Sequence, residues 1–334
     1  MELKYLKNKL PFIFLMTVLA AVFLIFAGAP ESNAKEKENI PPPRFYPAKP
    51  QKDSDIINRQ DVEYPFTFIA YGDSREPSSE AKYILIERII KEDPLFVIHL
   101  GDMVTYGEKE QWDIFDRSEG KIISAGIPFY PVPGNHEYYT SKRGYPDDPE
   151  EQIKHYFKRF TFLKERLWYS FKYGNSLFMI LDTNTNYSKE SPQHKWFMER
   201  LSQEKHEFLF IAFHHPPYTK NEKKSLRKSE RFLAGILEGY KSRDLLKADI
   251  VFSSHTHNYE RYLYGGINYV VSGGGGAPQY PVARDADDLY TGEGEVYHYC
   301  KITVSEKEAI FQMYKLMDDN SWKIADSFVI KTKK

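Results

Sequence analysis

Five short apolar runs in this chain are each followed by residues with carboxylate, carboxamide or imidazole side chains, and nothing else in the sequence restricts the possible folds as much. Short apolar runs are typical of buried parallel strands, and open α/β sheets bind their ligands beyond the carboxyl ends of such strands. The five endings are Gly72-Asp73-Ser74-Arg75, Gly101-Asp102, Pro133-Gly134-Asn135-His136-Glu137, His214-His215-Pro216-Pro217-Tyr218 and His255-Thr256-His257. Any one of them alone would most simply form a polar turn. Five in succession predict that these side chains meet in one site.

The segments between the runs carry apolar residues at helical spacing, so strands and helices alternate along the chain. We expect helices over residues 79–91, 108–117, 149–160, 193–201 and 226–240. We expect strands over residues 66–71, 95–100, 129–132, 208–213 and 250–252, and a hairpin of 168–172 with 177–181. Further strands are expected over residues 262–263, 267–271, 296–304, 309–315 and 328–330. This order predicts an α/β core that is followed, toward the C-terminus, by an antiparallel sheet.

The N-terminal segment has the features of an export signal. Lys4, Lys7 and Lys9 precede an uncharged apolar run over residues 10–29, and small residues at 32 and 34 stand before the expected cleavage site. The apolar run is also almost long enough to span a bilayer, so an uncleaved membrane anchor over residues 1–34 is the alternative. In both cases the rest of the chain is expected outside the cytoplasm, as a secreted, periplasmic or membrane-anchored protein. Residues 35–63, rich in Lys, Glu, Pro and Gln, predict a disordered linker, and residues 64–334 predict a single domain.

The charge balance argues against one class of partner. The 334 residues include 46 basic and 47 acidic side chains, mixed along the chain, with a formal net charge of -1, so no nucleic acid is expected as an obligatory partner. Hydrophobic residues make up 41% of the chain, enough for a sizeable core. The single cysteine, Cys300, cannot form an internal disulfide and is expected in the core. The composition does not predict the oligomeric state.

The side chains at the five endings suit a pair of metal ions. Oxygen and imidazole ligands without thiolate favour Zn, Mn, Fe, Co or Ni over a structural cysteine-type zinc site. One carboxylate can bridge two cations about 3.5 to 4 Å apart that share a hydroxide nucleophile. The pair His255 and His257 could alternatively be two polar loop histidines, and the upstream endings make the metal interpretation the stronger one.

Residues 66–261 resemble the calcineurin-like metallophosphoesterases, and within them the purple acid phosphatase-like branch, with all five endings in order. Three further fragments are similar to that branch: Leu181-Asp182-Thr183, Gln193-His194-Lys195-Trp196 and Asn258-Tyr259-Glu260-Arg261. The resemblance implies a fold of two mixed β-sheets flanked by helices, an α-β-β-α sandwich.

The same resemblance implies which residues act. A first divalent ion would be held by Asp73, Asp102 and His257, and a second by Asp102, Asn135, His214 and His255, with Asp102 bridging. His136 corresponds to the histidine that faces the leaving group. Asn135, Arg75 and Tyr218 are expected to contact the substrate, and Tyr138 and Tyr139 to lie with Tyr218 at the mouth of the cleft.

Two positions depart from the pattern of the family. Arg75 stands where many members have a metal-binding histidine, so its guanidinium is expected to face the phosphate, or else to pair with Glu76 or Glu108. Thr105 stands where the coloured enzymes have the tyrosine that binds ferric iron, and Tyr106 is one residue further on. The two ions are therefore expected to be Mn, Zn or Fe, in a colourless protein.

Other polar residues near the endings have simpler roles. His215 is expected to support the site or the structure, with a ligand role as the alternative. His99, inside a predicted strand, is expected to be a core histidine, and Asp182 and Asn184 to form a turn.

The predicted function is an exported dinuclear-metal phosphoesterase that attacks a small-molecule or macromolecular phosphoester with a metal-bridging hydroxide, most simply a phosphatase acting on monoesters. Two alternatives remain: a phosphodiesterase acting on nucleotides or lipid head groups, and a non-catalytic surface protein that binds phosphate or metal.

Overall fold

The computed structural model describes residues 58–59, 62–141, 149–221, 233–235, 237–238, 248–286 and 288–332. All of them belong to one compact unit, Phe45–Lys334. The predicted export signal over residues 1–34, nearly all of the predicted linker and most of the predicted helix over 226–240 lie outside the described residues. Within the described part of the chain, no helix is both long enough and apolar enough to cross a membrane.

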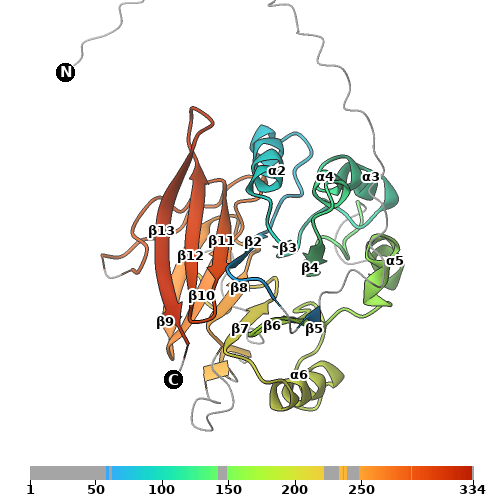
Figure 1. Ribbon diagram of the computed structural model, residues 1–334. Coiled ribbons are helices and arrows are strands. Elements are labelled where there is room, and N and C mark those ends of the chain that lie inside the picture. The colour runs from blue at the N-terminus through green and yellow to red at the C-terminus, as the bar shows by residue number, and fades with distance from the viewer. Residues whose placement is uncertain are drawn as a thin grey trace, which may run out of the picture. The chain divides into compact units, whose positions relative to one another are not determined.

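Up to β7, the predicted strands and helices are present in the predicted order, with bounds close to the expected ones (Figure 1). The helices are α2 (Glu80–Glu92), α3 (Lys109–Arg117), α4 (Gly120–Ser124), α5 (Pro149–Arg159), the 3-10 helix η2 (Thr161–Leu163) and α6 (Pro192–Gln203). The strands are β1 (Asn58–Arg59), β2 (Phe66–Tyr71), β3 (Phe96–His99), β4 (Phe129–Pro131), β5 (Tyr169–Tyr173), β6 (Ser176–Ile180), β7 (Phe208–Ala212), β8 (Ile250–Ser253), β9 (Tyr259–Tyr264), β10 (Ile267–Ser272), β11 (His298–Val304), β12 (Glu308–Leu316) and β13 (Trp322–Lys331).

The strands form two mixed sheets, which confirms the fold class. The six-stranded sheet has the order β13-β12-β11-β2-β3-β4, and the seven-stranded sheet has the order β1-β5-β6-β7-β8-β10-β9. Strands β2, β3 and β4 are parallel, as are β6, β7 and β8. Parallel strands of one sheet share a carboxyl end, so the polar residues that follow them are brought to one edge.

The sequence suggested that the C-terminal strands form an antiparallel sheet of their own. The structure divides them between the two mixed sheets instead. Strands β9 and β10 extend the seven-stranded sheet, whereas β11, β12 and β13 extend the six-stranded one. β11 pairs antiparallel with β2, with Ile302 opposite Phe68. Without β11, the buried strand β2 would present unpaired backbone groups on one side, and this pairing satisfies them.

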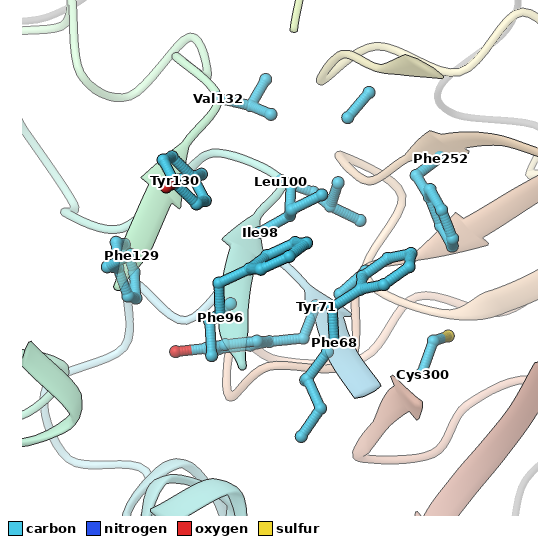
Figure 2. Close-up of a cluster of buried hydrophobic side chains, with 14 of the residues drawn as sticks. Phe68, Tyr71, Phe96, Ile98, Leu100, Phe129, Tyr130, Val132, Phe252 and Cys300 are labelled. Carbon is cyan, nitrogen blue, oxygen red and sulfur yellow. The ribbon is translucent and has the colours of Figure 1, made fainter. Parts of the chain in front are cut away.

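The two sheets pack face to face through aromatic side chains. The ring of Phe68 on β2 lies 5.1 Å from the rings of both Phe178 on β6 and Phe210 on β7, and 6.3 Å from Phe252 on β8. Figure 2 shows Phe68, Phe96 and Phe252 gathered in this layer, with Cys300 at its margin. Cys300 is fully buried, which confirms its expected place in the core. Because β2 and β3 are buried on both faces, they are nearly continuous apolar runs.

Helices cover the outer faces of both sheets. Leu201 of α6 packs with Leu209 and Ile211 of the seven-stranded sheet, whereas α2, α3 and α4 lie beside β2, β3 and β4 (Figure 1). The start of α2 is set by Ser79, whose hydroxyl accepts a hydrogen bond from the backbone N–H of Lys82 at 3.3 Å. These layers fix the positions of the strand ends described next.

Candidate metal centre

Six residues predicted as metal ligands follow the carboxyl ends of strands from both sheets. Three of them leave the six-stranded sheet: Asp73 after β2, Asp102 after β3 and Asn135 after β4. The other three leave the seven-stranded sheet: His214 after β7, and His255 and His257 after β8. Hydrogen bonds and close contacts join the two sets, so the structure brings all six together at the junction of the sheets.

Four of these residues have a backbone conformation that L-residues rarely adopt. The φ angles are 57° at Asp73, 57° at Asp102, 69° at His255 and 31° at His257. Non-glycine residues with positive φ cost of order 1 kcal/mol each and are concentrated at functional sites. The chain keeps carboxylates and imidazoles here in spite of that cost, which indicates that their side chains are needed.

Two glycines let the loops approach one another. A Cβ atom at Gly134 would lie 2.3 Å from Oδ1 of Asp102, and one at Gly101 would lie 2.7 Å from Nδ1 of His214. No side chain fits at either distance, and Gly101 also has a φ of 96°. The glycines before Asp102 and Asn135 are therefore required by the close packing of the site, and not only by the turns in which they lie.

The residues predicted for the second ion surround the Nε2 atom of His214. This atom lies 3.1 Å from Oδ1 of Asn135, 3.1 Å from Nδ1 of His255 and 3.3 Å from Oδ1 of Asp102. The Nδ1–H group of His214 donates to the carbonyl of Leu100 at 2.8 Å, and this bond directs Nε2 toward the other three residues. The four side chains offer the mixed nitrogen and oxygen donors that divalent transition metals bind.

The residues predicted for the first ion include a buried carboxylate oxygen without a hydrogen-bond partner. Oδ1 of Asp73 is that atom, and it lies 3.2 Å from Nε2 of His257. Oδ2 of the same carboxylate accepts hydrogen bonds from the backbone N–H of His255 at 2.6 Å and from the hydroxyl of Ser254. A buried carboxylate oxygen with no donor is costly unless a cation neutralises it. Asp73, Asp102 and His214 also offer ligand atoms within 4.8 Å of one another, so this donor set fits a metal ion.

The carboxylates and imidazoles of the site shift one another's pKa values. Burial opposes a charge on His214, but the carboxylates of Asp102 and Asp73 outweigh it and raise the pKa of His214 to about 9. Burial also opposes the charge on Asp102, yet His214 and His136 hold its pKa well below the usual range. At neutral pH His214 therefore carries a second proton, which a metal ion bound at Nε2 would replace.

Glu137 supports the site, and the sequence interpretation assigned it no role. Its fully buried carboxylate accepts backbone N–H groups from Asp102 at 3.0 Å, Met103 at 2.8 Å and Gly134 at 2.6 Å. Burial, together with the nearby charge of Asp102, raises the pKa of Glu137 to about 7. The side chain thus fastens the loop after β3 to the loop after β4. Its position directly after His136 was the only available signal.

Arg75 and His136 both lie beside the carboxylate of Asp102. Nε of Arg75 is 4.0 Å and Nε2 of His136 is 3.7 Å from Oδ2 of Asp102. Nε of Arg75 is buried and has no hydrogen-bond partner. Thr105 joins the two residues, because its hydroxyl donates to the carbonyl of Arg75 at 2.9 Å and its own carbonyl accepts from Nδ1 of His136 at 2.7 Å. The hydroxyl of Thr105 is therefore engaged in a hydrogen bond with the backbone of Arg75.

The alternative partners proposed for Arg75 are engaged elsewhere. The carboxylate of Glu76 accepts hydrogen bonds from the backbone and hydroxyl of Ser78, at 3.3 and 2.8 Å. The carboxylate of Glu108 accepts from the backbone and hydroxyl of Ser141, at 2.9 and 2.8 Å. The structure therefore favours the interpretation in which the guanidinium of Arg75 faces the metal centre.

The structure does not bring Tyr218 into this group. Its hydroxyl donates to Glu238 at 2.6 Å, and its ring lies 4.3 Å from the ring of Tyr264 and 4.9 Å from that of Tyr269. Tyr138 is also removed from the expected cleft mouth, because it is buried and donates its hydroxyl to Asp182 at 2.9 Å. Sequence proximity to a ligand did not predict where these aromatic side chains point.

Two other interpretations agree with the structure. His99 is fully buried, accepts the backbone N–H of Gly101 at 3.2 Å and contacts the hydroxyl of Ser74 at 2.9 Å through Nε2, which confirms a core histidine. Oδ1 of Asp182 accepts the backbone N–H of Asn184 at 2.8 Å, which is the hydrogen bond of an Asx turn. Burial raises the pKa of Asp182 to about 6.

Comparison with protein families gives a match over more than half of the chain. Residues 66–259 match the model described as calcineurin-like phosphoesterase. The match begins at β2 and ends just after His257, so it contains all six predicted ligands.

The individual relatives share only about a quarter of their residues with this chain, and several of them are longer than it. A Hordeum vulgare protein named nucleotide pyrophosphatase/phosphodiesterase is 26% identical over 287 residues, covering 74% of this chain and 74% of that protein. An Allium cepa protein named phosphoenolpyruvate phosphatase is 25% identical over 257 residues, covering 69% of this chain and 48% of that protein, so the chain spans about half of its length. Among solved structures, the purple acid phosphatase PPD1 of yellow lupin (Lupinus luteus) superposes with a TM-score of 0.67 at 19% identity, covering 83% of this chain and 55% of that one. This last likeness is one of fold.

Proposed function

The chain belongs to the calcineurin-like phosphoesterase family, and from that premise we propose that it is a two-metal phosphoesterase that hydrolyses phosphomonoesters. One observation carries the proposal: two groups of ligand atoms meet at a single carboxylate, Asp102, with the unpartnered Oδ1 of Asp73 in one group and Nε2 of His214 in the other. Asp73, Asp102 and His257 would hold one ion, and Asp102, Asn135, His214 and His255 the other. When bound, such a pair supplies charge neutralisation and activation of the attacking water.

The residues beside the metal centre support a monoester as substrate. Arg75 places a permanently positive guanidinium with a free Nε next to Asp102, on the same oxygen that His136 approaches. A phosphomonoester carries up to two negative charges on its terminal oxygens, whereas a diester carries one. The guanidinium fork would orient the phosphate and compensate its second charge. His136 would then stand near the oxygen of the leaving group.

Hydrolysis of diesters is the second candidate. The Hordeum vulgare relative, matched over 74% of this chain and 74% of its own length, is named as a nucleotide pyrophosphatase/phosphodiesterase. Both candidates use the same ligands, so a comparison of substrates separates them.

The test is a substrate panel on the metal-stripped protein reloaded with Mn, Zn or Fe(II). We expect phosphomonoesters to be turned over faster than phosphodiesters, and no turnover before a metal is added. A faster reaction with diesters would transfer the assignment to the second candidate. Metal binding without turnover of any ester would support a binding protein instead.

Arg75→Ala adds a second test to the substrate panel. The decrease in kcat/KM that it causes should depend on the charge of the substrate. Removing a charged hydrogen-bonding group costs about 1.5 to 3 kcal/mol, which is roughly 10- to 100-fold in kcat/KM. We expect that loss with monoesters and a smaller one with diesters. Arg88→Ala is the control, since Arg88 pairs with Glu92 within α2. Equal losses on both substrate classes would remove the argument for a monoester.

We also propose that the protein acts outside the cytoplasm. The support is the basic start and the apolar run over residues 10–29. We expect exported protein to begin near Lys35. N-terminal sequencing of protein recovered outside the cytoplasm checks this. Full-length protein in the membrane fraction would support an uncleaved anchor, and full-length soluble protein inside the cell would contradict export.

A further inference from the structure

A third imidazole lies against the second group of ligands. His215 follows His214 on the loop after β7 and is only 2% exposed. Its ring centroid is 4.9 Å from that of His214 and 4.5 Å from that of His255, and those two rings are 5.0 Å apart. The three histidines offer nitrogen atoms that all lie within 4.8 Å of one another, so a single ion could contact all three after small side-chain movements.

Thr183 holds the ring of His215 in the manner that is usual for metal-binding imidazoles. The Thr183 hydroxyl oxygen accepts the backbone N–H of His215 at 3.2 Å and lies 2.8 Å from its Nδ1. A hydroxyl oxygen has two lone pairs, so it can accept from the backbone N–H and from Nδ1–H together. In that tautomer Nε2 carries the free lone pair. Metal-bound histidines almost always donate their other N–H to a fixed oxygen in this way.

Two of the three other predicted imidazole ligands, His214 and His257, show the same arrangement. Nδ1 of His214 is 2.8 Å from the carbonyl of Leu100, and Nδ1 of His257 is 2.8 Å from the carbonyl of Pro278. His215 therefore shares burial and an anchored Nδ1 with both of them, and proximity to another imidazole with His214. A buried core histidine such as His99 also has polar partners for its ring nitrogens. What sets His215 apart is that its ring lies against two predicted ligands, His214 and His255.

We propose that His215 is a further ligand of the second metal position, beside His214 and His255. The inference rests on the proposed metal centre and not on which ester is the substrate. Three imidazoles with Asp102 and Asn135 make this position rich in nitrogen. Imidazole suits Zn, Ni and Cu, whereas Mn prefers oxygen ligands. The second position should therefore discriminate against Mn more strongly than the first, whose donors include two carboxylates.

The test measures metal binding and metal coordination, without any substrate. Zinc affinity is determined by competition with a chelator, and the number of imidazoles around zinc by X-ray absorption, for the wild type and for His215→Phe. We expect the zinc ion that dissociates more easily to bind about 10- to 100-fold less tightly in His215→Phe than in the wild type. A loss of this size is typical when a residue that supports a metal ligand is removed. The absorption spectrum should lose scattering from one imidazole, and the preference for zinc over manganese should fall.

Two further variants make the test decisive. Thr183→Val keeps the imidazole but removes its anchor, so it should weaken zinc binding even if His215→Phe fails to fold. His206→Asn is the control, because His206 contacts the carbonyl of Glu204 on the loop between α6 and β7. Unchanged zinc affinity in folded His215→Phe, or a weaker affinity with an unchanged imidazole count, would overturn the ligand role. Absence of any phosphoesterase activity would affect the proposed function alone.

Discussion

Asp102→Asn is expected to abolish turnover and to release metal, because one carboxylate serves both groups of ligands. Oδ1 of Asp102 lies 3.3 Å from Nε2 of His214 and accepts the backbone N–H of His136 at 3.0 Å, while Oδ2 faces Arg75 and His136. A carboxamide has the same shape but no negative charge, and its nitrogen cannot bind a cation. A bridge between two ions at this residue would therefore be lost, together with the charge that would hold them.

Metal content by mass spectrometry and hydrolysis rates measured with added metal check this expectation. Asp113→Asn is the matched control, since Asp113 pairs with Lys109 within the exposed part of α3. The control should keep its metal and its rate. An Asp102→Asn protein that retained two ions and full activity would show that the bridge is made by another residue.

His136→Ala is expected to lower kcat by roughly two to four orders of magnitude while metal is retained, which is the usual contribution of a positioned proton donor. Nδ1 of His136 is 2.7 Å from the carbonyl of Thr105, which leaves Nε2 to face the site. Burial lowers the pKa of His136, and Arg75 adds to this against the opposite effect of Asp102. The protonated form of His136, which can donate a proton, is therefore populated mainly at a pH below the ordinary pKa of histidine.

The sign of the pH dependence follows from that lowered pKa. With esters that have a poor leaving group, kcat should fall as the pH rises through a value below about 6.5, the ordinary pKa of histidine, and the fall should disappear in His136→Ala. Esters with a good leaving group need no proton and should show a much smaller loss. His155→Ala, on α5, is the control histidine. Full activity of His136→Ala on a poor leaving group would exclude the acid role.

The sequence predicted the parts of the site that depend on local pattern. Asp73 and Asp102 each follow an apolar run and a glycine, and strand ends in a parallel sheet must meet at one edge, so their meeting could be predicted without coordinates. Helical periodicity predicted α2 and α6 within a few residues, and in the structure Ser79 and Ser191 cap their starts.

The rest depends on contacts between segments far apart in the chain. The hydrogen bonds of Glu137 to Asp102 and Met103, and of Ser254 to Asp73, join residues that no local pattern relates. The division of the C-terminal strands between two sheets was missed for the same reason, because alternation along a strand does not say which edge it will join. The contact of Tyr218 with Glu238 could not be predicted either, because proximity to His214 in sequence does not fix the direction of a side chain.

The ligands leave two different sheets, and this has a consequence for when the centre can form. Asp73, Asp102 and Asn135 belong to one sheet, and His214, His255 and His257 to the other, so neither sheet alone offers a complete set. Contacts of such long sequence separation form late in folding, because the entropy of closing the intervening loops must be overcome first. A metal centre built from both sets could therefore be completed only after the two sheets have docked. The ions of such a centre would be taken from those present where the two sheets dock, within the preference that the ligands set.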